Sequence, residues 1–167
     1  MITNGFAGKA LLALLGRSTW ALINTYYALI VEKEYYPDTI VIITEEPYKE
    51  QLDKAREGLE ILSSEHGFTP EISEISLPSS SFIEAGKQIS SLVKQLKADD
   101  YEIAIDITGG RKALVAGTML SIANQDVHHV FYLAIDSLDD ASKPYMMIPL
   151  SIQHLRDFTE EAERIQV

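Results

Sequence analysis

Short runs of almost purely apolar residues alternate along this chain with segments of helical periodicity, and this alternation limits the fold more than any other feature. Residues 9–15, 39–44 and 102–107 each have the length and the continuous hydrophobicity of a strand that is buried on both faces. After the first run, Trp20 and Ile23 begin a stripe of apolar residues at helical spacing. Strands that alternate with helices favour a mainly parallel sheet, covered on both faces and joined by right-handed crossovers.

Three further strands complete the predicted sheet. Residues 68–76 alternate between apolar and polar, which is typical of an edge strand, while residues 129–135 and 145–148 form two more short apolar runs. An acidic helix follows from about Ile152. The helix over residues 112–124 is apolar nearly all round, so we expect it to be deeply buried. The pattern predicts a Rossmann-like three-layer α/β sandwich with a six-stranded sheet whose last strand is antiparallel.

The length of 167 residues fits one domain, and an apolar content of 46% supplies a sizeable core. We assign residues 1–150 to the Rossmann-like domain and residues 151–167 to a C-terminal helix or linker. No apolar run reaches the roughly 18 residues of a transmembrane helix, and the chain has no cysteine. We therefore expect a cytoplasmic protein.

The chain is acidic, with 14 Lys and Arg against 25 Asp and Glu and a formal net charge of -11. This balance argues against a protein that coats long nucleic acid with a broad basic surface. An anionic partner must instead be bound by a few cations at one local site. Without cysteine, the four scattered histidines predict no zinc site, and we expect neither a metal nor a cofactor.

The common strand order 3-2-1-4-5-6 places the first and fourth strands side by side, with the topological switch point between them. The loops that follow these strands, residues 16–19 and 108–112, should then face each other across one crevice at the carboxyl edge of the sheet. Open α/β sheets bind their ligands in such crevices. These two loops therefore form the candidate site.

The first loop carries groups that suit an anion. Gly16 allows a tight exit from the strand, Arg17 offers a fork of donors, and Ser18 and Thr19 supply hydroxyls beside the free N–H groups of a helix N-terminus. Trp20 could stack on a base, and packing against the sheet is the alternative. A plain strand-to-helix connection with capping residues would show the same pattern.

The second loop adds two glycines and two cations. Gly109 and Gly110 let the backbone approach a ligand closely, while Arg111 and Lys112 place positive charge at the N-terminus of the next helix, where it opposes the helix dipole. A bound anion would relieve that conflict. Neither loop matches the Walker A or the G-x-G-x-x-G pattern, so a phosphate would be held in a different manner.

Two polar residues just before the glycines complete the candidate site. Asp106 and Thr108 can orient the turn or bond to a ribose hydroxyl. The predicted ligand-binding residues are Gly16, Arg17, Ser18, Thr19, Trp20, Asp106, Thr108, Gly109, Gly110, Arg111 and Lys112.

Residues 106–112 (DITGGRK), together with residues 14–19 (LLGRST), resemble the CRISPR-associated Rossmann fold (CARF) domain family, and the likeness covers about residues 9–149. The resemblance implies a homodimer that binds one ring of cyclic oligoadenylate, most commonly cyclic tetra-adenylate, a second messenger of type III CRISPR antiviral defence. It also implies that Ser18 or Thr19, together with Lys112, contacts the ligand.

The same resemblance leaves the activity open. Stand-alone members are often metal-independent ring nucleases, in which a ribose 2′-hydroxyl attacks the adjacent phosphorus to give a 2′,3′-cyclic phosphate; Lys112 and Ser18 would then be the catalytic residues. Other members are non-catalytic sensors that control a fused or associated effector, such as a nuclease, a membrane protein or a transcriptional regulator. A Rossmann-like domain for another nucleotide is a third interpretation.

Overall fold

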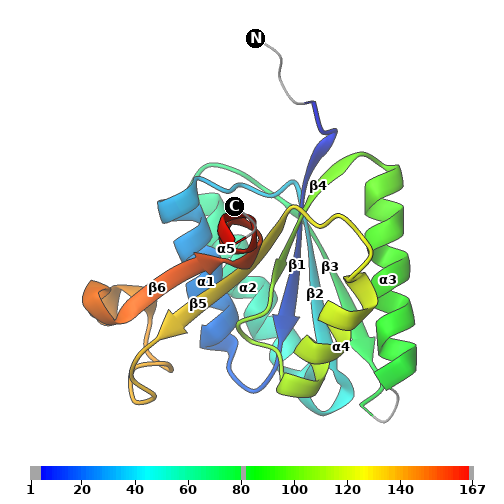
Figure 1. Cartoon of the computed structure of the whole chain (residues 1–167). Helices are drawn as coiled ribbons and strands as arrows, with labels where there is room; N and C mark the ends of the chain where they lie inside the picture. The colour runs from blue at the N-terminus through cyan, green and yellow to red at the C-terminus, as the bar shows by residue number, and fades with distance from the viewer. Residues whose placement is uncertain (1–4, 80–81, 166–167) are drawn as a thin grey trace.

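A computed structural model describes residues 5–79 and 82–165 of the chain, which form one sheet flanked by helices (Figure 1). The strands are β1 (Gly8–Leu15), β2 (Thr39–Glu45), β3 (Glu71–Leu77), β4 (Tyr101–Asp106), β5 (His129–Ile135) and β6 (Gln153–Asp157). The helices are α1 (Thr19–Lys33), α2 (Leu52–Glu65), α3 (Phe82–Ala98), α4 (Lys112–Ile122) and α5 (Phe158–Ile165). Short 3-10 segments cover Glu46–Gln51, Tyr145–Met147 and Leu150–Ile152.

The strand order is β3-β2-β1-β4-β5-β6, with every pair parallel except β5 and β6. Both the predicted Rossmann-like order and the antiparallel last strand are therefore confirmed. β1 is the central strand between β2 and β4, and its Leu12 lies opposite Val41 on one side and Ile105 on the other. Because β1 and β4 are neighbours, the loops that follow them emerge side by side at the carboxyl edge.

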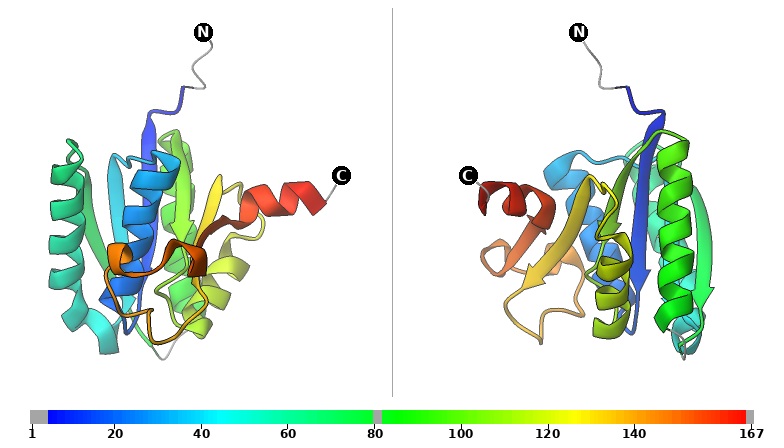
Figure 2. Two further views of the ribbon diagram at one scale, coloured as in Figure 1. Left: turned by 90° about the vertical axis from the view of Figure 1, so that its left-hand side faces the viewer. Right: turned by 45° about the vertical axis from the view of Figure 1, so that its right-hand side comes forward.

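Helices cover both faces of the sheet, with α1 and α2 on one face and α3 and α4 on the other (Figures 1 and 2). Alternate residues of β1 enter different cores: Leu11 packs with Tyr26 of α1 and Leu59 of α2, whereas Leu12 packs with Ile89 and Val93 of α3. Since both faces are buried, both sets of side chains must be apolar, which is why β1 reads as an uninterrupted hydrophobic run.

The predicted position of the sixth strand is wrong. Residues Tyr145–Met147 form a 3-10 turn between Pro144 and Pro149, and the side chains of Met146 and Met147 are exposed. The antiparallel strand is instead Gln153–Asp157, within the segment where the sequence analysis expected a helix from about Ile152. The two prolines prevent Tyr145–Met147 from completing a ladder, and the polar sequence QHLRD suits an edge strand with one exposed face.

The expected deep burial of α4 is also wrong for one of its faces. Leu114 and Ile122 are buried against the sheet, but Ala113 and Ala116 are exposed and Leu120 is 71% exposed. A single layer of helices covers this side of the sheet, so half of an all-apolar helix remains uncovered. Within the described part of the chain, no helix combines the length and hydrophobicity that a membrane span requires.

Candidate functional site

The two predicted loops touch each other at the carboxyl edge of the sheet. A Cβ atom at Gly16 would lie 2.3 Å from the carbonyl oxygen of Gly109, and one at Gly109 would lie 2.5 Å from the carbonyl oxygen of Leu14. Both distances are far below van der Waals contact, so these glycines are required by the approach of one loop to the other. At Gly16 this agrees with the predicted tight exit from the strand, whereas at Gly109 the backbone that comes close is that of Leu14.

A cavity of about 610 Å³ opens beside the joined loops, above the N-termini of α1 and α4. Seven of the predicted residues line it, with Ala21 and Ala113 completing its wall. The seven are Arg17, Ser18, Thr108, Gly109, Gly110, Arg111 and Lys112.

Both helix N-termini offer hydrogen-bond donors to this cavity. Ser18 caps α1, and its hydroxyl accepts a hydrogen bond from the backbone N–H of Ala21 at 3.3 Å. At the start of α4, Arg111 occupies the N-cap position without a side-chain cap, which leaves the first N–H groups of that helix for a ligand. Lys112 is exposed and forms no ion pair with any residue that the structure describes.

Three other predicted residues contact neighbouring elements instead of lining the cavity. The buried Gly16 lies between the loops, and the hydroxyl of Thr19 donates to Oε1 of Gln51 at 2.8 Å. Trp20 lies in a separate apolar groove with Tyr27 and Tyr145. The residues that line this groove belong to α1, α2 and residues 144–146, so Trp20 lies apart from the cavity and beside helices, not the sheet against which packing was the alternative.

Asp106 and Thr108 hold the turn that carries the two glycines. The Thr108 N–H donates to Oδ1 of Asp106 at 2.9 Å, and the Thr108 hydroxyl accepts from the N–H of Leu133 at 3.0 Å. Asp106 is only 2% exposed, and burial raises the pKa of its carboxyl to about 7. Because its carboxyl is buried under the loop, Asp106 orients the turn from below.

Two residues that the sequence analysis missed bind the arginines of the site. The buried Glu45, the last residue of β2, accepts two hydrogen bonds from Arg111, from Nε at 2.8 Å and from Nη2 at 2.9 Å. The Arg111 guanidinium also lies over the ring of Tyr48, 5.6 Å from its centre, and Arg17 Nε donates to the Tyr48 hydroxyl at 3.4 Å. The signal that could have revealed them is topological: β2 adjoins β1, so its carboxyl end must border the same crevice.

These contacts set the electrostatics of the cavity. The hydrogen bond from Arg17 is the main cause that lowers the pKa of Tyr48, and the Glu45 carboxylate raises the pKa of Arg111. Glu45 compensates the charge of Arg111, whereas Arg17 and Lys112 have no carboxylate partner among the described residues. Two uncompensated cations and an uncapped helix N-terminus suit a phosphate-bearing ligand.

Several solved structures share this fold. Can2 from Sulfobacillus thermosulfidooxidans, solved with cyclic tetra-adenylate, aligns with a TM-score of 0.55 and 14% identity over 74% of this chain and 31% of Can2. Enterococcus italicus Csm6, solved with cyclic hexa-2′-fluoro-hexa-dAMP, aligns with a TM-score of 0.60 and 16% identity over 94% of this chain and 44% of Csm6. Protein VC1899 from Vibrio cholerae aligns with a TM-score of 0.59 and 12% identity over 74% of this chain and 30% of VC1899.

These likenesses support the fold, and the chain spans less than half the length of each of the three proteins. No curated protein sequence matches it. A sequence family described as the Csa3 CRISPR-associated Rossmann-like domain matches residues 22–143, which include the Gly109–Gly110 loop. The resemblance to CRISPR-associated Rossmann folds is thereby confirmed, and the chain belongs to the family of Csa3 CRISPR-associated Rossmann-like domains.

Proposed function

We propose that this domain binds a cyclic oligoadenylate, with cyclic tetra-adenylate as the first candidate, across a homodimer in type III CRISPR signalling. The observation that carries the proposal is the cavity at the switch point, which Arg17, Lys112 and the N-terminus of α4 line, and where no described carboxylate pairs with Arg17 or Lys112. Phosphodiesters need such positive groups, and an otherwise acidic surface disfavours long RNA. The ligands named for Can2 and Csm6 support this choice.

The homodimer is supported by an apolar surface beside the cavity. Phe82 and Ile83 of α3 are 50% and 70% exposed, and Leu120 of α4 is 71% exposed. These side chains border one groove, while Ala113 at the start of α4 lines the cavity itself. A two-fold partner on this face would cover the apolar side of α4 and bring two cavities together around one symmetric ring.

Calorimetry with cyclic tetra-adenylate tests the binding. We expect one ring per two chains, and Lys112→Ala should weaken binding by about 1.5 to 3 kcal/mol because a charge-assisted contact is lost. Lys143→Ala is the matched control, since Lys143 pairs with Asp140 in a different loop. Unchanged binding by Lys112→Ala, or one mononucleotide bound per chain, would contradict the proposal.

The dimer has its own test in the molar mass measured by light scattering. Leu120→Glu should give monomers that bind the ring weakly, because it places a charge on the apolar face of α4. Ile61→Glu is the control, since Ile61 is 54% exposed on α2, across the sheet from α4. A dimer that survives Leu120→Glu would place the interface elsewhere.

Binding rather than rapid cleavage is what the cavity favours. Its lining contains no carboxylate or imidazole side chain among the described residues, so a general base for the 2′-hydroxyl is lacking there. Lys112 could still stabilise the developing charge and Ser18 could position the phosphate. We expect mostly intact ring after incubation in excess EDTA; complete conversion to 2′,3′-cyclic phosphate ends within minutes would assign a ring nuclease instead.

A further inference from the structure

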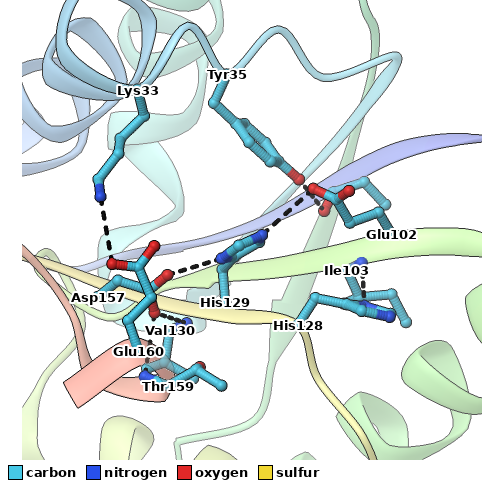
Figure 3. Close-up of polar contacts among 11 residues, drawn as sticks. Lys33, Tyr35, Glu102, Ile103, His128, His129, Val130, Asp157, Thr159 and Glu160 are labelled. Atoms are coloured by element: carbon cyan, nitrogen blue, oxygen red, sulfur yellow. Dashed lines mark hydrogen bonds and ion pairs between the residues drawn. The ribbon is translucent and has the colours of Figure 1, made fainter. Parts of the chain in front are cut away.

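A second polar cluster lies at the amino edge of the sheet, away from the cavity. His129 begins β5, Asp157 ends β6 and Glu160 lies in the first turn of α5 (Figure 3). One potential ligand atom from each of the three residues lies within 4.8 Å of the others. Three separate elements thus bring one imidazole and two carboxylates to one point.

Both nitrogens of the His129 ring face carboxylates. Its Nδ1 lies 2.7 Å from Oδ2 of Asp157, and its Nε2 lies 3.4 Å from Oε1 of Glu102. A neutral imidazole carries one N–H and can donate to only one of these carboxylates. The other nitrogen then faces a carboxylate oxygen with a lone pair on each side. A second proton on the ring removes this repulsion, and a metal ion in place of the Nδ1 proton would remove it once Nδ1 and Oδ2 move apart from their 2.7 Å separation.

The surroundings hold two of the three groups in place. The His129 ring stacks on Phe131, with ring centres 5.2 Å apart and planes within 7°. Oδ1 of Asp157 accepts hydrogen bonds from the N–H groups of Val130 and Thr159, at 3.2 Å and 3.1 Å, which leaves Oδ2 to face His129. Such fixed orientation is what a metal site needs from its surroundings.

Glu160 is the exposed member of the cluster. Its side chain is 49% exposed, and among the described residues its one ion pair is a 3.6 Å contact with Lys33, whose side chain is 35% exposed. Exposed pairs of this length contribute little free energy. The carboxylate can therefore turn from Lys33 toward an ion held by His129 and Asp157.

We propose that Nδ1 of His129, Oδ2 of Asp157 and a carboxylate oxygen of Glu160 bind a divalent transition-metal ion, with Zn²⁺ as the first candidate. One nitrogen and two carboxylate oxygens suit Zn²⁺ better than Mg²⁺, which prefers an all-oxygen shell and retains its waters. Two carboxylates balance the charge of the ion, and the N–H that remains on Nε2 faces Oε1 of Glu102 at 3.4 Å, close to the arrangement found behind many metal-bound histidines.

This proposal departs from our expectation that the chain has no metal site. That expectation counted histidines and cysteines along the sequence and could not place Asp157 or Glu160, because residues 153–157 were not recognised as a strand. The metal would join β5, β6 and α5. Its proposal does not depend on the cyclic oligoadenylate, since the cluster and the cavity lie at opposite edges of the sheet.

Calorimetry on the full chain after treatment with EDTA tests the site. We expect one Zn²⁺ per chain, bound at least about 100-fold more tightly than Mg²⁺, and a higher melting temperature with Zn²⁺. Glu160→Gln should weaken Zn²⁺ binding at least about tenfold, and Glu102→Gln about 10- to 100-fold. Glu161→Gln is the control: the adjacent Glu161 pairs with Arg156, so its removal should leave the affinity unchanged.

Two outcomes overturn the proposal. Absence of Zn²⁺ binding would mean that a proton is the cation between His129 and Asp157. Equal Zn²⁺ binding by the wild type and Glu160→Gln would place the metal elsewhere. Because Glu160 is exposed, that variant should fold even if His129→Gln does not, and circular dichroism verifies this. The visible absorption of bound Co²⁺ gives a second readout that reports the coordination number directly.

Discussion

The two edges of the sheet differ in whether their charged side chains have partners of opposite charge. At the carboxyl edge, Arg17 and Lys112 lie beside the N-termini of two helices without a carboxylate partner among the described residues. At the amino edge, Glu102, Asp157 and Glu160 surround one imidazole, and each has a partner within 4 Å. The carboxyl edge thus carries positive charge that no described carboxylate compensates, although the chain as a whole is acidic.

The difference separates groups that stabilise the fold from groups that are free for a ligand. Paired groups at the amino edge gain their favourable interactions within the chain itself. Cations at a helix N-terminus oppose the helix dipole and gain nothing from folding. Such a local conflict is what one expects at a binding site, where the ligand supplies the missing charge.

The largest effect that we predict concerns Asp106, the acid buried beneath the Gly109–Gly110 turn at the carboxyl edge. Its carboxyl has a pKa of about 7 in the folded chain and about 4 in the unfolded chain. The folded state therefore holds a proton that the unfolded state has lost, and stability falls as pH rises from about 4 through about 7. Asp106→Asn should remove this loss. The free energy of unfolding of the variant, relative to that of the wild type, should therefore increase by up to about 1.4 kcal/mol per pH unit in that window.

Urea denaturation of both proteins at pH 5, 6, 7 and 8 measures this difference. Comparing the two proteins cancels the other carboxylates that titrate in the same range. Asp139→Asn is the control, because Asp139 is exposed in the loop after β5. A difference in the free energy of unfolding between Asp106→Asn and the wild type that does not change with pH would show that Asp106 is ionised throughout. The carboxyl edge would then have no neutral carboxyl at Asp106.

The strand order and the meeting of the two loops were predictable from the sequence because they follow from apolar periodicity and topology. Runs such as residues 9–15 identify buried strands, and the switch point then fixes where the loops lie. The placement of Arg17, Ser18 and Lys112 around one cavity follows from these two facts. No tertiary contact had to be known in advance.

The features that sequence reasoning missed depend on tertiary contacts. β6 has five mostly polar residues, and only pairing with β5 makes it a strand. Glu45 is distant from Arg111 in sequence, and their ion pair exists because β2 and β4 flank the same central strand. The contacts of Asp157 at the other edge were missed for the same reason as β6.

Gly109→Ala should have the next largest effect, because its Cβ would lie 2.5 Å from the carbonyl oxygen of Leu14. The loops must separate to admit it, and we expect a loss of about 1 to 3 kcal/mol in the free energy of unfolding. Gly86→Ala in α3 provides the opposite case: its Cβ would lie 3.5 Å from Ser121 of α4, an ordinary contact, so helix propensity should stabilise the chain. Equal stability of the two variants would show that the loops are not tightly joined.

Glu45→Gln tests whether Arg111, whose charge Glu45 compensates, can contribute that charge to ligand binding. Loss of the carboxylate frees the charge of Arg111, so we expect affinity for cyclic tetra-adenylate to rise by about twofold to fivefold. The same calorimetric titration measures it. A fall in affinity would mean instead that Glu45 orients Arg111 toward the ligand and that its charge is less important than its position.

The smallest effect compares one lysine from each edge by chemical denaturation. Lys33 ends α1, where its charge favours the helix dipole and pairs with Glu160, so Lys33→Ala should destabilise the chain by less than about 1 kcal/mol. Lys112 begins α4, where its charge opposes the dipole, so Lys112→Ala should stabilise the chain by a few tenths of a kcal/mol. A clear loss of stability in Lys112→Ala would show that this lysine supports the fold. Lys112 would then not be a cation that is free for a ligand, and the contrast between the two edges would be wrong. Opposite signs in the two variants, together with weaker ring binding in Lys112→Ala alone, would establish that the chain keeps this cation for its ligand.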